Sequence, residues 1–262
     1  MKDDIPAAFG RLKRPLLMTH VVAGYPDLDR SREMVATMAG QGVGLIEIQI
    51  PFSDPLADGP TITRANQQAL RNGVRPQDCF KMVRELAPRL ASPLLMVTYG
   101  NIPYQMGLDT FAAECAAAGA SGVLIPDLPF DESPLDLPAL FDRRGLCYVP
   151  LISPGMRAER LRKVLALASG LVYLTLRTGI TGALSRVEDK GLAFIDLVRN
   201  MSRLPLAAGF GLSSPEHIRL LKNKVEAVVI GSHLINTYDR AGLPGLVEFL
   251  RLCREEISSD PE

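Results

Sequence analysis

The sequence lacks an excess of charge of either sign. Its 262 residues include 29 Lys and Arg side chains and 29 Asp and Glu side chains, for a formal net charge of +0. A chain without an overall field has no long-range attraction for nucleic acid or for an anionic membrane surface. We therefore expect no nucleic-acid or membrane partner, and recognition through local contacts.

Cysteine motifs and long apolar runs are missing as well. Cys79, Cys115, Cys147 and Cys253 form no CxxC pair and have no His nearby at zinc-ligand spacing, so reduced thiols and no metal site are expected. The first six residues form no hydrophobic signal segment, and no later apolar run reaches the roughly 18 residues needed to cross a bilayer. We expect a cytoplasmic protein.

Short apolar runs are what the chain does contain. Eight runs rich in Val, Ile and Leu are typical of buried parallel strands, which are covered on both faces. They lie near Leu16–Val22, Gly44–Ile50, Pro93–Thr98, Gly122–Ile125, Cys147–Leu151, Gly170–Leu174, Pro205–Ala208 and Ala227–Ile230. Segments with helical periodicity alternate with them, including Asp29–Gly40, Pro76–Leu90, Leu108–Ala118, Ala158–Ala168, Lys190–Met201 and Pro215–Leu221.

Eight strand-then-helix units in a chain of this length predict a closed (β/α)8 TIM barrel of the α/β class. No GxGxxG motif opens a helix, and low-complexity tracts and linkers are absent, so we expect one domain over residues 1–262. An extra N-terminal helix around Ile5–Leu12 would close the barrel bottom. Long gaps after the second and sixth strands predict long βα loops there, where the chemistry of such barrels lies.

The second predicted strand places a carboxylate inside the barrel. Ile46, Ile48 and Ile50 would face the surrounding helices, which turns Glu47 and Gln49 toward the interior near the barrel mouth. A buried carboxylate is costly without a partner or a chemical task. Glu47 is therefore either a candidate catalytic group or an interior carboxylate held by a hydrogen bond or a basic side chain.

Glycine-rich turns follow the last two predicted strands. Gly209-Phe210-Gly211 comes after the seventh strand and Gly231-Ser232 after the eighth, where such barrels usually bind phosphate through backbone N–H groups and a helix N-terminus. Plain tight turns are the alternative. The sixth loop, Arg177–Ala183, combines two glycines with hydroxyl side chains, which is typical of a loop that closes over a substrate.

One motif is specific enough to indicate a family. Glu47 followed by PFSDPLADGPT over Pro51–Thr61 resembles the signature of the α subunit of tryptophan synthase. The resemblance continues in order and spacing along nearly the whole chain, through Gly24–Asp27, Thr98–Asn101, Pro126–Pro129, Gly179–Gly182, Gly209–Gly211 and Gly231–Ser232.

The resemblance implies a reversible retro-aldol cleavage of indole-3-glycerol phosphate to indole and glyceraldehyde 3-phosphate. It implies that Glu47 is the general acid and base, that Asp58 bonds the indole N–H, and that Tyr173 lies beside the reacting centre. Taken alone, Asp54 and Asp58 stand beside Pro or Gly, where Asp is also an ordinary turn residue. The phosphate-binding positions implied by the resemblance are Gly182, Phe210, Gly211, Gly231 and Ser232.

The resemblance also implies a partner. Family members work with a pyridoxal-phosphate-dependent β subunit, in an α2β2 heterotetramer, and carry no metal or cofactor in the α subunit itself. The second loop faces that partner, so Pro51 and Asp54 are expected at the interface. Thr181 matches the sixth-loop threonine that meets the second loop when the site closes.

Three positions at or near the predicted indole pocket depart from the family pattern. Gln49 stands where the family usually has Gly, and it could crowd the indole pocket or hydrogen-bond Glu47. His20 and Val22 stand where Phe and Thr are common, at or near the same pocket. His20 is either a satisfied core histidine or an acid–base group. The departures leave two alternatives open: a related phosphate-binding barrel lyase with another substrate or stand-alone indole production, and a weakly catalytic subunit that mainly activates a β partner.

Overall fold

A computed structural model describes residues 5–11, 15–128, 131, 136–176, 187–209, 211–212 and 214–259. The strands are β1 (Leu16–Val22), β2 (Leu45–Gln49), β3 (Leu94–Val97), β4 (Gly122–Leu124), β5 (Cys147–Tyr148), β6 (Leu151–Ile152), β7 (Val172–Thr175), β8 (Leu206–Gly209) and β9 (Ala227–Ile230). The helices are α1 (Ile5–Arg11), α2 (Leu28–Gly40), α3 (Pro60–Arg71), α4 (Pro76–Leu86), α5 (Asn101–Met106), α6 (Leu108–Ala118), α7 (Leu137–Asp142), α8 (Ala158–Leu167), α9 (Val187–Met201), α10 (Pro215–Leu221) and α11 (Ser232–Ser258), with a 3-10 turn at Ala87–Arg89.

The sheet closes on itself through an interrupted strand. All strand pairs are parallel, in the order β5-β4-β3-β2-β1-β9-β8-β7-β6, so the two ends of the order are consecutive in the chain. Between them, Val149 N donates to Val123 O and Tyr173 N donates to Pro150 O. Pro150 has no N–H to continue the ladder. The predicted fifth strand is thus split into β5 and β6, and the predicted (β/α)8 barrel is confirmed.

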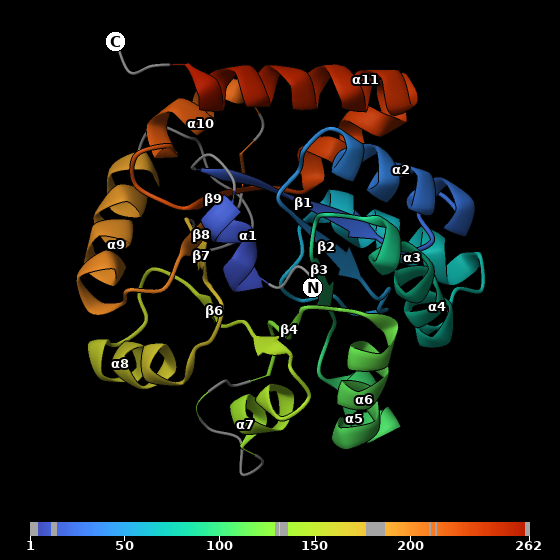
Figure 1. Ribbon diagram of the computed structural model, residues 1–262, viewed down its shortest axis with the longest axis horizontal. Coiled ribbons are helices and arrows are strands. Elements are labelled where there is room, and N and C mark those ends of the chain that lie inside the picture. Colours follow the sequence, from blue (N-terminus) through green and yellow to red (C-terminus); the bar gives the residue numbers. More distant parts are fainter. Residues whose placement is uncertain are drawn as a thin grey trace.

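The two faces of the strands carry two separate apolar clusters. Ile46 and Ile48 belong to the outer cluster, packed among the helices, whereas Leu45 belongs to an inner cluster. Ile5, Ala8 and Phe9 of α1 join this inner cluster, and Figure 1 shows α1 within the ring of strands. The predicted N-terminal helix therefore closes one end of the interior, which leaves the other end for the site.

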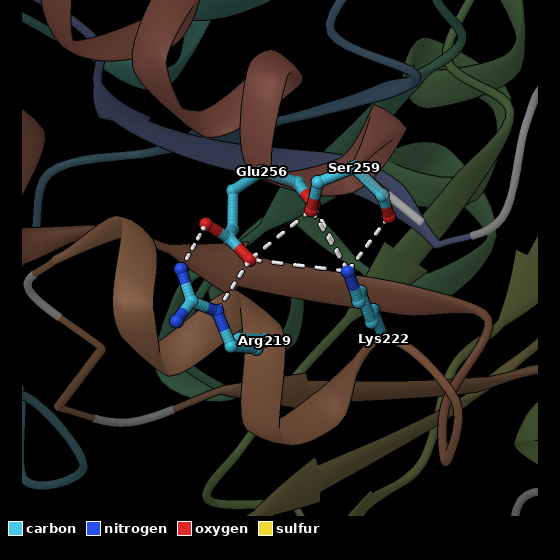
Figure 2. A network of polar contacts seen from close by, with 4 residues as sticks. All are labelled: Arg219, Lys222, Glu256 and Ser259. Atoms are coloured by element: carbon cyan, nitrogen blue, oxygen red, sulfur yellow. Dashed lines mark hydrogen bonds and ion pairs between the residues drawn. The ribbon is translucent and has the colours of Figure 1, made fainter. Parts of the chain in front are cut away.

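Polar contacts anchor the C-terminal end of α11 to α10. Arg219 donates two hydrogen bonds to Glu256, at 2.9 and 3.0 Å, and the Lys222 ammonium donates to the carbonyl and hydroxyl of Ser259, at 2.8 and 2.9 Å (Figure 2). Inside α11, Gly242 has φ 61, a left-handed backbone value that favours glycine, and the helix kinks there. Of the described helices, none has the length and hydropathy to cross a membrane.

Candidate active site

The carboxyl ends of the strands surround a cavity of about 490 Å³, a size typical of small-molecule sites. Its walls come from distant parts of the chain, which the parallel sheet brings to one end of the barrel. Seven of the residues singled out from the sequence line it: His20, Glu47, Asp58, Tyr173, Gly211, Gly231 and Ser232.

Glu47 lies near the end of β2 with a side chain that is almost fully buried. Its Oε2 is 3.0 Å from Nδ1 of His20, and both side chains face the interior. The contact follows from register, because His20 of β1 lies directly beside Glu47 of β2 in the parallel ladder. The sequence left open whether this carboxylate is held or reactive. It is held by His20, and it also faces the cavity.

Asp58 is placed by the loop that follows β2. The side-chain amide of Gln49 donates to Asp58 Oδ2 at 2.7 Å, and the N–H of the preceding Ala57 donates to the Tyr99 hydroxyl at 3.1 Å. Burial raises the pKa of Asp58 above its ordinary value, while the charge of His20 and the bond from Gln49 lower it. The carboxylate is thereby held at the cavity wall by a neutral donor, the Gln49 amide.

The expectation for Gln49 needs correction. The residue is fully buried and does not line the cavity, so it does not crowd a ligand there. Its amide nitrogen bonds Asp58 and lies 3.4 Å from Oδ1 of Asn66, which also accepts from Phe52 N. Gln49 therefore orients Asp58, whereas the sequence had suggested crowding of the pocket or a bond to Glu47. Asn66, on α3, gave no signal in the sequence.

Tyr173 supplies a neutral phenol to the cavity. Burial, together with the charges of Glu47 and Asp58, raises its pKa well above the ordinary value. Gly209 on the neighbouring strand makes room for it, because a Cβ at that position would lie 2.9 Å from the Tyr173 hydroxyl. The phenol therefore keeps its proton and can act only as a neutral hydrogen-bonding group.

Part of the cavity wall is formed by glycines and the start of a helix. Gly231 follows β9 and is the N-cap of α11, which begins at Ser232, so the first N–H groups of that helix lie at the cavity. Gly211, with φ 89, lines the cavity after β8. No lysine or arginine is among the lining residues in the part of the chain that the structure describes. Thr181, Gly182 and Phe210 lie outside the described residues.

The remaining predicted positions lie away from the cavity surface. Val22 is buried in the outer cluster and is not among the residues that line the cavity. Pro51 is buried too, whereas Asp54 is exposed. Leu56 in the same loop is 80% exposed, a feature that the sequence analysis missed. Within the described ranges, no group of three or more His, Cys, Asp or Glu is arranged to hold a metal.

Comparisons with known proteins place the chain among relatives of known family. The family model described as "Tryptophan synthase alpha chain" matches residues 7–245. The tryptophan synthase alpha chain of Syntrophotalea carbinolica is 38% identical, over 91% of this chain and 94% of that protein, and the one of Chloroflexus aurantiacus is 40% identical, over 90% of each.

Solved structures extend the likeness to three dimensions. Tryptophan synthase from M. tuberculosis, in an aminoacrylate-bound form, superposes with a TM-score of 0.87 at 28% identity, over 97% of this chain and 98% of that one. Tryptophan synthase subunit alpha from Legionella pneumophila gives 0.86 at 28% identity, over 97% of each. Matched along nearly its whole length in sequence and in fold, the chain belongs to the tryptophan synthase alpha chain family.

Proposed function

We propose that this cavity performs the lyase reaction of the family, the cleavage of indole-3-glycerol phosphate to indole and glyceraldehyde 3-phosphate, with Glu47 as the group that moves protons. The bond from indole C3 to the glycerol chain breaks once C3 gains a proton and the adjacent hydroxyl loses one. A single carboxyl group between these two atoms can give the first proton and take the second. The buried Glu47 carboxylate facing the cavity is the observation that carries the proposal.

Asp58 has the geometry for the second role. Protonation at C3 places positive charge on the indole ring, and a carboxylate at the ring N–H stabilises that charge. Gln49 holds one Asp58 oxygen at 2.7 Å, which leaves the other side of the carboxylate for the substrate. Tyr173, kept neutral by burial, borders the reacting atoms without competing for their protons.

The phosphate of the substrate is assigned to the part of the cavity wall formed by glycines and the start of α11. Gly211, Gly231 and Ser232 line the cavity, and the N-terminus of α11 offers N–H groups and the positive end of a helix dipole. Gly182 and Phe210 complete the site in this proposal, and Thr181 closes the sixth loop over it. Dipoles rather than cations would neutralise the phosphate charge.

The second loop is the proposed contact with a β subunit. Leu56 is 80% exposed and borders the cavity, and Asp54 is exposed beside it. A solvent-exposed apolar side chain next to a binding cavity is typical of a surface that a partner protein covers. We propose a cytoplasmic α2β2 assembly, in which pyridoxal phosphate belongs to the β subunit and this chain needs no cofactor of its own.

One observation favours a second candidate. His20 borders the cavity, and it could select another aryl or alkyl glycerol phosphate. If indole-3-glycerol phosphate proved inert while a related phosphate was cleaved, this related lyase would replace the main proposal.

The experiment is direct. The purified chain is incubated with indole-3-glycerol phosphate, alone and with the β subunit of the same organism, while indole and glyceraldehyde 3-phosphate are followed together. We expect slow cleavage alone, faster cleavage with the partner, and loss of cleavage in Glu47→Gln. Glu159→Gln, which changes an exposed carboxylate on α8, is the matched control and should cleave like the unmodified chain. Cleavage unchanged in Glu47→Gln would overturn the role of Glu47.

A further inference from the structure

Two buried polar atoms beside the catalytic carboxylates have no hydrogen-bond partner among the described residues. They are Nε2 of His20 and Oε1 of Gln49. A buried polar atom without a partner is destabilising, so two of them on side chains of one site need an explanation. Both side chains are also bonded at their other ends, His20 to Glu47 and Gln49 to Asp58.

Neighbouring strands place these groups in a row. His20 and Glu47 are register partners on β1 and β2, and Gln49 lies two residues further along the same inner face of β2. Glu47 bonds His20 and Gln49 bonds Asp58, and the Gln49 side chain also raises the pKa of His20. His20 therefore bonds one carboxylate and feels the charge of a second, Asp58, in a site whose lining in the described chain includes no lysine or arginine.

The donors and acceptors in this row decide the state of His20. The Gln49 amide nitrogen is committed to Asp58, so its oxygen, which only accepts, is left over. A neutral imidazole that donates from Nδ1 to Glu47 has a bare nitrogen at Nε2, which also only accepts. Protonation of Nε2 turns this mismatch of two acceptors into a donor and an acceptor, and the imidazolium then faces a carboxylate at 3.0 Å.

We infer that His20 is a positioning residue that holds, as an imidazolium, the proton which Glu47 delivers to indole C3, with Gln49 stabilising the charged form. This rests on the proposed role of Glu47. The proton passes from Nδ1 to Glu47 Oε2 and then to C3. The bond from C3 to the glycerol chain breaks, its electron pair returns to the ring, and the hydroxyl proton passes to Glu47 and back to His20. At the end, His20 and Glu47 together carry the same number of protons as at the start.

The charges around His20 agree with this assignment. Burial by itself lowers the pKa of His20, but the bond and charge of Glu47, the charge of Asp58 and the side chain of Gln49 raise it, and the net shift is upward from 6.5. Tyr173 faces the site from β7 as a neutral phenol, and burial lowers the pKa of His233 at the start of α11. Of the two histidines that line the cavity in the described chain, His20 is therefore the one whose surroundings favour the protonated form.

The test is the pH profile of kcat for indole formation by the complex with the β subunit. His20→Asn keeps a donor near the Nδ1 position but cannot titrate. We expect the unmodified protein to lose activity as the pH rises through the pKa of His20, and His20→Asn to lose this basic limb with a kcat reduced about tenfold or more. Gln49→Met should move the limb to lower pH, and the control His217→Gln should leave the profile unchanged.

A second measurement does not depend on activity. The imidazole of His20 is followed by nitrogen NMR in the folded chain, where we expect a pKa above 6.5 that falls in Glu47→Gln. A neutral His20 at pH 7, or a His20→Asn variant with the unmodified kcat and pH profile, would overturn the inference. If Glu47→Gln also cleaved indole-3-glycerol phosphate normally, the proposed function would fail together with the inference. If Glu47→Gln were inactive while His20→Asn behaved normally, only the inference about His20 would fail.

Discussion

The inner face of the barrel is divided into two regions that use the same strands for different purposes. In the lower region, toward the start of β1 and β2, Leu16, Met18 and Leu45 pack with α1 in an apolar cluster. In the upper region, toward the ends of the same strands, this face carries His20 and Glu47. On each strand the last core residue and the first site residue are two positions apart. The lower region therefore gives a rigid base, and the upper region holds the buried polar groups of the site above that base.

The largest expected effect is loss of catalysis in the upper region. Asp58→Asn removes the negative charge that would face the indole N–H, while the amide keeps the shape of the side chain. We expect kcat to fall about a hundred- to ten-thousand-fold, the range typical of acid–base and charge-stabilising groups. Indole formation measures it, and the exposed Asp142→Asn is the control. Activity within a factor of two of the control would remove Asp58 from the mechanism.

Next in size is loss of stability in the lower region. Leu45 is fully buried against the inner cluster, so Leu45→Ala should lower the free energy of unfolding by about 2–5 kcal/mol through lost burial and a cavity. Denaturant unfolding measures it. Because Leu45 does not line the site cavity, the folded fraction should keep its kcat. A large fall in kcat of the folded protein would show that the two regions are not separate.

A smaller effect is the pH dependence of stability that His20 contributes. The folded-state pKa of His20 is raised, so the stabilisation is fully present below the unfolded value of 6.5 and is lost as the pH rises through the folded value. We expect the difference in unfolding free energy between the unmodified protein and His20→Asn to be larger at about pH 6 than at about pH 9. A difference that is constant over this range would contradict the protonated His20.

The smallest effect should come from the surface, outside both regions. Arg219 is largely exposed although it makes two hydrogen bonds to Glu256. Exposed ion pairs contribute about 0–1 kcal/mol, so Arg219→Ala should change the unfolding free energy by no more than that and leave kcat unchanged. A change as large as that of Leu45→Ala would mean that the anchoring of α11 is central to the fold.

The barrel itself was predictable because apolar runs and their spacing are local features. Leu16–Val22 and Ala227–Ile230 agree with the observed β1 and β9, and the inward direction of Glu47 followed from strand alternation. The fifth strand was predicted as one run, although Pro150 within it, which has no N–H to donate, could have indicated the split into β5 and β6. Motif resemblance, more than periodicity, singled out Asp58 and Tyr173.

Contacts between distant segments were not predictable. The bond between His20 and Glu47 depends on the register of β1 against β2, and the bond from Gln49 to Asp58 depends on how the second loop folds back over its own strand. Asn66 holds that loop from a helix that follows it. No local pattern encodes these arrangements, since they depend on the register between two strands and on the path of the second loop.

The most direct test of the division is one variant measured in two ways. Glu47→Gln is assayed for indole formation with the β subunit, and its free energy of unfolding is measured beside that of Leu45→Ala. We predict that Glu47→Gln loses nearly all activity yet keeps a higher free energy of unfolding than Leu45→Ala. Leu45→Ala should show the opposite pattern, with a lower free energy of unfolding and a normal kcat in its folded fraction. If Glu47→Gln instead kept its activity, or lost it only in proportion to unfolding, Glu47 would be part of the core rather than of the chemistry.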